Sequence, residues 1–149
     1  MVVDRFGLAT FACLFNKDFS KVLMIKRNEE KKKKYGFDWG IIGGKIEFEE
    51  YSKDAVIREI KEEIGIEIQK DDLKFLYMKE VPNWFNVSHV VFFIYGARID
   101  EKTKIILNDE SEGYQWFDVK NLPESKSSDD DILEILRVTK EKFESEDIY

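Results

Sequence analysis

The chain has 149 residues and a formal net charge of −7, and its length predicts one domain, residues 1–149, with a substantial core. The negative charge argues against general nucleic-acid binding, which needs a basic surface. The single cysteine excludes an internal disulfide bond and no apolar run reaches membrane-spanning length, so we expect a cytoplasmic protein without a membrane partner.

Apolar runs and polar turns alternate in the first third of the chain. Residues 6–15 and 21–26 predict two partner strands joined by a polar turn. Residues 28–34 hold two acids followed by four lysines, and we interpret this run as a solvated surface loop. Residues 39–46 predict a short strand that leads through two glycines into the next segment.

An amphipathic helix is expected over residues 53–64. Ser52 is the expected N-cap, and Gly65 stands where a left-handed residue commonly ends a helix. The apolar stripe of this helix, which should bury against a sheet, consists of Val56, Ile57, Ile60 and Ile64.

The second half of the chain predicts further strands and a final helix. The strands are expected at residues 66–68, 73–81, 87–97 and 114–119, and the helix at residues 129–143. The whole pattern is typical of an α/β protein in which a mixed sheet is sandwiched by helices.

Three glutamates share one face of the helix at residues 53–64. Glu59, Glu62 and Glu63 fall within about 100° of arc, because positions three and four apart are neighbours on a helix. A solvated helix face is the ordinary meaning of such a pattern, but it does not explain Glu50 just before the helix or Arg58 beside the acids. Like charges at this spacing cost about 0.2–0.5 kcal/mol each, and a bound cation would relieve the repulsion.

The side chains available as ligands favour a hard cation. Carboxylate oxygens suit Mg²⁺ that is shared with substrate phosphates and water, with Mn²⁺ left open as a substitute. The sole histidine, His89, and the sole cysteine, Cys13, cannot assemble a zinc site. We interpret His89 as structural, with catalysis as the alternative, and Cys13 as a core thiol.

The segment from Gly44 to Ile66 reads GKIEFEEYSKDAVIREIKEEIGI. It resembles the Nudix box at every fixed position. The resemblance implies an α/β/α sandwich and a hydrolase that uses a divalent metal to cleave nucleoside diphosphates linked to another moiety. The matching residues are Gly44, Glu50, Arg58, Glu59, Ile60, Glu62, Glu63, Gly65 and Ile66.

The same resemblance implies roles for the charged residues. Glu59 is the first choice for general base, with Glu62 or an acid outside the box as the alternative, and Arg58 is expected to orient the acids. The implied catalytic set is Glu59, Glu62, Glu63 and Arg58. The implied Mg²⁺ set is Gly44, Glu59, Glu62, Glu63 and Glu112, with Glu110 as the alternative to Glu112.

Substrate contacts are also assigned by resemblance. Arg27 ends a strand where a basic residue often meets phosphate, and Lys45 follows the two glycines as a point charge. Ile42 stands where the family commonly has a proline. One aromatic residue is expected to stack on a base, and the candidates are Trp39, Trp84 and Phe85.

The expected partner is a small-molecule nucleotide. Residues 39–45 and the acids at 129–131 resemble enzymes that split purine nucleoside triphosphates to monophosphate and pyrophosphate. Pro82, sixteen residues after Ile66, favours the alternative of an ADP-ribose hydrolase, and a dinucleoside polyphosphate hydrolase is also open. A non-catalytic nucleotide-binding protein would usually lack box glutamates, and none is missing here. A homodimer is left open.

Overall fold

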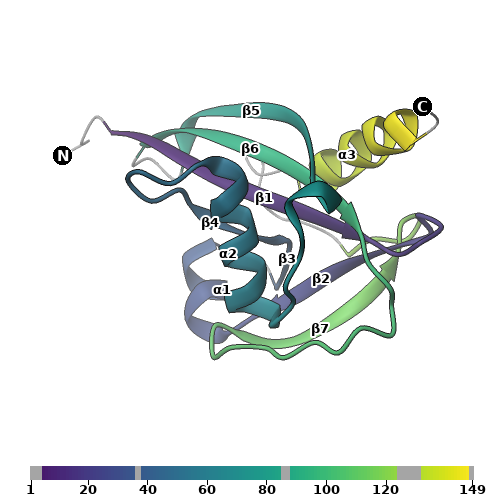
Figure 1. Cartoon of the computed structure of the whole chain (residues 1–149). Helices are drawn as coiled ribbons and strands as arrows, with labels where there is room; N and C mark the ends of the chain where they lie inside the picture. The colour runs from purple at the N-terminus through teal and green to yellow at the C-terminus, as the bar shows by residue number, and fades with distance from the viewer. Residues whose placement is uncertain (1–4, 36–37, 85–87, 124–131, 148–149) are drawn as a thin grey trace.

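The computed structural model describes residues 5–35, 38–84, 88–123 and 132–147. Within these ranges it is a mixed α/β fold built on a seven-stranded sheet, as the sequence predicts (Figure 1). The elements are β1 (Phe6–Phe15), β2 (Lys21–Arg27), α1 (Glu29–Tyr35), β3 (Trp39–Gly40), β4 (Ile42–Lys45), α2 (Ser52–Ile64), a 3₁₀ turn (Lys70–Asp72), β5 (Lys74–Trp84), β6 (Ser88–Arg98), β7 (Ser111–Asp118) and α3 (Ile132–Asp147).

Strand β1 organises the sheet. It runs parallel to β6 along its whole length, from the pair Phe6 and His89 to the pair Phe15 and Arg98. Strand β5 pairs antiparallel with the far edge of β6. On its other edge β1 pairs with β4 and, at its end, with β2, which in turn carries β3 and β7. This arrangement fixes the two glycines of β4 directly against the central strand.

The two faces of the sheet bury separate cores. Successive side chains of a strand point to opposite faces, so alternate residues of β1 enter different cores. Helix α3 contributes Leu136 to one core, and helix α2 contributes Val56, Ile60 and Ile64 to the other. The helices therefore cover opposite faces, which gives the layered architecture that the sequence predicts. Among the described helices, none combines the length and apolar character needed to cross a membrane.

The prediction of a loop at residues 28–34 is wrong, because most of this segment forms α1. The backbone N–H of Lys31 donates to the side-chain oxygen of Asn28 at 2.9 Å, which caps the helix. Two acids occupy the first turn of α1 and three lysines its last turn, and both groups complement the helix dipole. A short helix of this composition shows no apolar periodicity.

Three smaller expectations also need correction. Ser52 is the first residue of α2 rather than its N-cap, which is Tyr51, and the hydroxyl of Ser52 lies 2.6 Å from that of Tyr95. Residues 66–68 are not a strand. The strand expected at residues 39–46 is divided into β3 and β4. The predicted end of α2 is confirmed, since Gly65 has a φ of 72°.

Candidate active site

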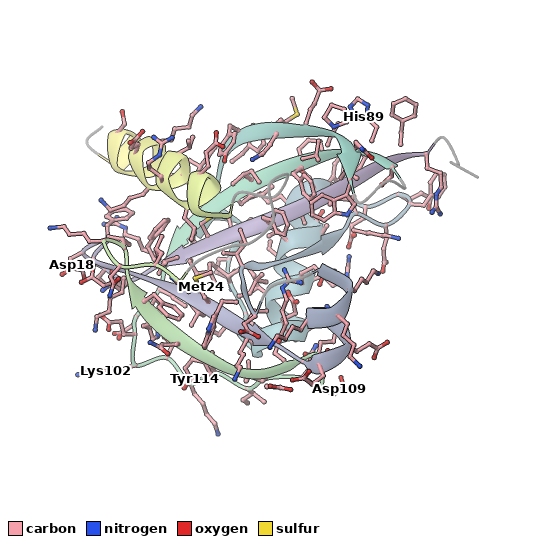
Figure 2. All side chains as sticks on the ribbon, turned by 180° about the vertical axis from the view of Figure 1, so that it is seen from behind. Asp18, Met24, His89, Lys102, Asp109 and Tyr114 are labelled. Carbon is pink, nitrogen blue, oxygen red and sulfur yellow. The ribbon has the colours of Figure 1, made fainter. Side chains whose placement is uncertain are left out.

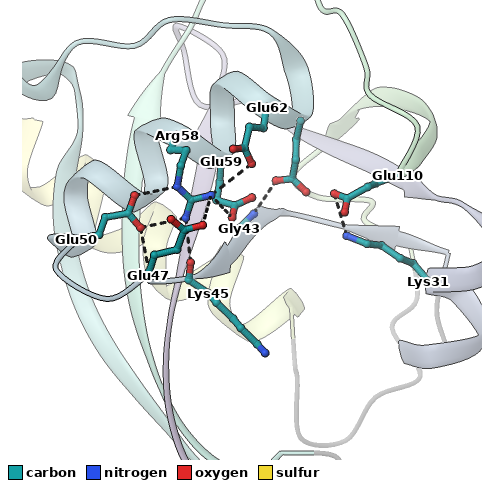
Figure 3. A network of polar contacts seen from close by, with 10 residues as sticks. Lys31, Gly43, Lys45, Glu47, Glu50, Arg58, Glu59, Glu62 and Glu110 are labelled. Atoms are coloured by element: carbon teal, nitrogen blue, oxygen red, sulfur yellow. Dashed lines mark hydrogen bonds and ion pairs between the residues drawn. The ribbon is translucent and has the colours of Figure 1, made fainter.

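Arg58 on α2 ties together the loop before the helix and the helix itself (Figure 3). Its Nε and Nη2 donate to the two carboxylate oxygens of Glu50 at 2.8 and 3.0 Å. Its Nη1 donates to Glu59 at 3.0 Å, and Nη2 also donates to the backbone carbonyl of Lys45 at 3.1 Å. The hydrogen bonding of Glu50 to Arg58 is the main cause of the lowered pKa of Glu50. Arg58 therefore holds Glu50 and Glu59 by charge-assisted hydrogen bonds.

Gly44 allows Glu59 to lie against β4. A Cβ at Gly44 would overlap the Glu59 carboxylate, so a residue with a side chain would push the acid away. The pKa of Glu59 is raised by burial, and the charge and hydrogen bond of Arg58 oppose the rise. The absence of a side chain at position 44 is thus a requirement of the site's geometry.

Glu63 is the most buried acid of the site, with an exposed fraction of 4%. The backbone N–H of Gly43 donates to its carboxylate at 3.1 Å. Burial raises the pKa of Glu63 to about 8, and the charge of Glu59 adds to the rise. A carboxyl group with so strong a shift beside a second acid is a feature of functional sites.

Glu62 is the most exposed of the three glutamates of α2, at 55% of its side chain. Its carboxylate lies 3.4 Å from Nη1 of Arg58. We use the name acid cluster for Glu59, Glu62 and Glu63. The structure thus brings the whole predicted catalytic set together on one face of α2.

The acid outside the box that faces the acid cluster is Glu110. Its charge contributes to the raised pKa of both Glu59 and Glu63, after burial and closer charges. Glu112 lies on β7, where it is exposed. The structure therefore favours the alternative, Glu110, over Glu112.

The chemistry of the donor set fits a hard cation, because the acid cluster offers carboxylate oxygens close to the backbone of Gly43 and Gly44. In the arrangement described, Arg58 occupies part of that donor set. No group of three or more His, Cys, Asp and Glu side chains within the described ranges is arranged to hold a metal ion. The acids suit Mg²⁺ by type, and their coordination of it stays a prediction.

The predicted substrate residues do not belong to the acid cluster. The guanidinium of Arg27 lies over Gly40, where an added Cβ would come within 2.6 Å of Nη2. The amine of Lys45 points away from the acids, and only its carbonyl contacts Arg58 (Figure 3). Trp39 packs edge-on against Phe117, beside the core that contains Leu136 of α3.

Of the two remaining aromatic candidates, the structure describes Trp84 but not Phe85. Trp84 packs edge-on against Phe92. Phe85 and the acids at 129–131 lie outside the described residues. Pro82 is exposed on β5. Which of these residues would contact a base stays a prediction.

His89 and Cys13 agree with their structural interpretations. Nε2 of His89 lies 3.2 Å from Glu80, and its ring is 5.3 Å from that of Phe6. His89 lies far from Asp109, the neighbour of Glu110, on the opposite side of the molecule (Figure 2). Cys13 is fully buried in the core.

Sequence reasoning missed Lys31. Its Nζ lies 3.2 Å from the Glu110 carboxylate, so the lysine run is not simply a solvated surface. The signal was present: Asn28 followed by two acids is a pattern that starts a helix. That helix directs its third residue toward the acids.

Fold and site together define a Nudix protein. A family model described as NUDIX domain matches residues 5–137. The chain therefore belongs to the NUDIX domain family, whose members include hydrolases.

The proteins similar to this chain include an mRNA hydrolase, a MutT NUDIX hydrolase and a NUDIX domain bound to ADP ribose. A Saccharomyces cerevisiae protein described as m7GpppN-mRNA hydrolase is 30% identical over 113 residues, which are 74% of this chain and 11% of that protein. The chain thus spans only a small part of that relative's length. A MutT NUDIX hydrolase from Burkholderia pseudomallei is 25% identical with a TM-score of 0.71, over 93% of this chain and 98% of that one. The NUDIX domain of Shewanella oneidensis NrtR, solved with ADP ribose, shares the fold at 19% identity, with a TM-score of 0.73 over 93% and 89% of the two chains.

Proposed function

We propose that this protein is a metal-dependent pyrophosphohydrolase that splits a purine nucleoside triphosphate into the monophosphate and pyrophosphate. The observation that carries the proposal is the position of Glu59 and Glu63, two largely buried acids against Gly44 and Gly43. Burying two carboxylates side by side destabilises a fold, so their retention is explained best by a use in binding or catalysis.

In the proposed reaction, water attacks the α- or β-phosphorus, the anhydride bond between the α- and β-phosphates breaks, and the monophosphate and pyrophosphate separate. Glu59 takes the proton from the attacking water, for which its raised pKa suits it, because a general base works best near the operating pH. Glu62 is the alternative base. Arg58 holds Glu59 and the loop residue Glu50 in place through its hydrogen bonds.

The acid cluster would hold Mg²⁺ together with Glu110, which we choose over Glu112 as the acid outside the box. When bound, Mg²⁺ supplies charge neutralisation at the phosphate oxygens and lowers the pKa of a coordinated water. Gly44 has no side chain, which lets the carboxylate of Glu59 lie directly against β4.

The choice of substrate rests on the resemblance of residues 39–45 to triphosphate hydrolases. The m7GpppN-mRNA hydrolase of Saccharomyces cerevisiae suggests a second candidate substrate, a nucleotide cap, because the two sequences are 30% identical over 74% of this chain. The net charge of −7 favours a small nucleotide over a long RNA.

The test is product analysis with Mg²⁺ over purine triphosphates and their oxidised forms, ADP-ribose, diadenosine polyphosphates and a cap dinucleotide at equal concentrations. We expect the highest kcat/KM for a triphosphate, with monophosphate and pyrophosphate as products. Glu59→Gln should lower turnover by about 10²-fold or more with the fold intact. A higher kcat/KM for ADP-ribose or the cap would overturn the substrate, and normal turnover in Glu59→Gln would overturn the assigned role.

Metal dependence has its own test. Mg²⁺ that binds the native state raises its stability by about 2.7 kcal/mol at a hundredfold excess over its Kd. The wild-type melting temperature should therefore rise with Mg²⁺, and that of the Glu59→Gln/Glu63→Gln double variant should not. An equal rise in both proteins would place the ion elsewhere.

A further inference from the structure

Two cations flank the acid cluster from opposite sides (Figure 3). Arg58 is committed to the protein itself, with bonds of 2.8 to 3.1 Å to Glu50, Glu59 and the carbonyl of Lys45. Breaking these bonds to receive a phosphate would release both acids. A triphosphate that reaches the acids would therefore be served better by a cation of the protein other than Arg58.

Lys31 is the cation on the other side. Its Nζ lies 3.2 Å from Oε2 of Glu110, and its side chain is 30% exposed. Its charge also reaches Glu63, where it opposes the effects of burial and of Glu59 on the pKa. Lys31 thus pairs with Glu110, in the loop before β7, and its charge also acts on Glu63, the most buried acid of α2.

The position of Lys31 is built by Asn28. The side-chain oxygen of Asn28 accepts the backbone N–H of Lys31, and its side-chain nitrogen donates to the carbonyl of Asp109 at 3.1 Å. The backbone N–H of Asn28 donates to the carbonyl of Glu110 at 3.1 Å. One residue therefore fixes the start of α1 to the segment that carries Glu110, and Lys31 faces Glu110 as a result.

We propose that Lys31 is a phosphate-binding residue, which releases the carboxylate of Glu110 and binds an oxygen of the substrate's phosphate chain. The inference rests on the proposed function, because it concerns the same site. A phosphate oxygen is the same kind of acceptor for an ammonium group as a carboxylate oxygen, and a triphosphate carries more charge. The exchange also frees Glu110 as the substrate arrives.

Helix α1 supplies a matched control. Lys33 is exposed on the same helix, so Lys33→Ala removes an equal charge without touching Glu110. We expect Lys31→Ala to raise KM for the preferred triphosphate about tenfold, with kcat changed by less than about threefold, which is the effect of losing one charged contact to bound substrate. Lys31→Arg should restore most of the affinity, and Lys33→Ala should leave both constants unchanged.

Binding of inorganic pyrophosphate separates this inference from the proposed function. With Mg²⁺ present, we expect pyrophosphate to raise the melting temperature of the wild type and of Lys33→Ala, and to raise that of Lys31→Ala much less. If no nucleotide is hydrolysed but this pattern holds, the proposed function falls and the role of Lys31 stands. If the wild type hydrolyses triphosphates while Lys31→Ala keeps a normal KM and a normal pyrophosphate response, the role of Lys31 is refuted and the function stands.

Discussion

Replacing Glu63 by glutamine should stabilise the metal-free protein at high pH. Glu63 is 4% exposed, and burial raises its pKa from the ordinary 4.5 to about 8. Because the folded state raises this pKa, protonated Glu63 contributes stability to the fold. This contribution is fully present below pH 4.5 and is lost as the pH rises through 8. One pKa unit corresponds to about 1.4 kcal/mol, so the ionised carboxylate costs the fold up to about 5 kcal/mol at pH 9.

Glutamine keeps an oxygen that can accept the N–H of Gly43 but carries no charge. The hydrogen bond to a neutral acceptor is weaker, which offsets part of the gain. We therefore expect Glu63→Gln to exceed the wild type in free energy of unfolding by about 2–4 kcal/mol at pH 9, and by much less at pH 5.

Urea denaturation in EDTA at pH 5, 7 and 9 measures this difference. Glu62→Gln is the matched control, because it removes an exposed carboxylate from the same helix. A Glu63→Gln variant that is less stable than the wild type at pH 9, or equally displaced at every pH, would refute the reasoning from burial.

Three backbone positions give further predictions. Gly44→Ala should lower kcat about 10²-fold while the fold survives, because the new Cβ displaces Glu59, and steady-state kinetics with circular dichroism will check it. Gly65→Ala should destabilise the protein by about 1–2 kcal/mol in urea denaturation, because φ is 72° and Ile106 lies 3.1 Å from the added Cβ. Glu49→Gly should raise the free energy of unfolding by up to about 1 kcal/mol, because Glu49 has a φ of 68°, and a lower value would contradict strain there.

The sequence predicts most of the sheet and the catalytic helix because both depend on local patterns. The stripe from Val56 to Ile64 and the glycine at 65 are sufficient to define α2. Residues 66–68 look like a strand because Ile66 and Ile68 are both buried, yet they bury without a partner strand. Apolar alternation reports burial, and pairing depends on the rest of the sheet.

The site is predictable where one helix determines it. Spacing alone brings Glu59, Glu62 and Glu63 together, whereas the place of Glu110 depends on the contact between Asn28 and the segment before β7. The direction of Lys45 depends on the register of β4 against β1, which no local pattern records. The long-range contacts are therefore the part that sequence reasoning misses.

The parallel pairing of β1 with β6 has a consequence for folding. The paired residues are 83 positions apart, so the central strands meet only after most of the chain has been made. Helix α2 is synthesised inside that interval, when its buried Val56, Ile60 and Ile64 can pack on β1, β2 and β4 but not yet on the residues of β6 that complete their core. Such distant pairing slows folding and leaves apolar surface open to aggregation. The newly made chain is thus most vulnerable between the synthesis of α2 and the arrival of β6.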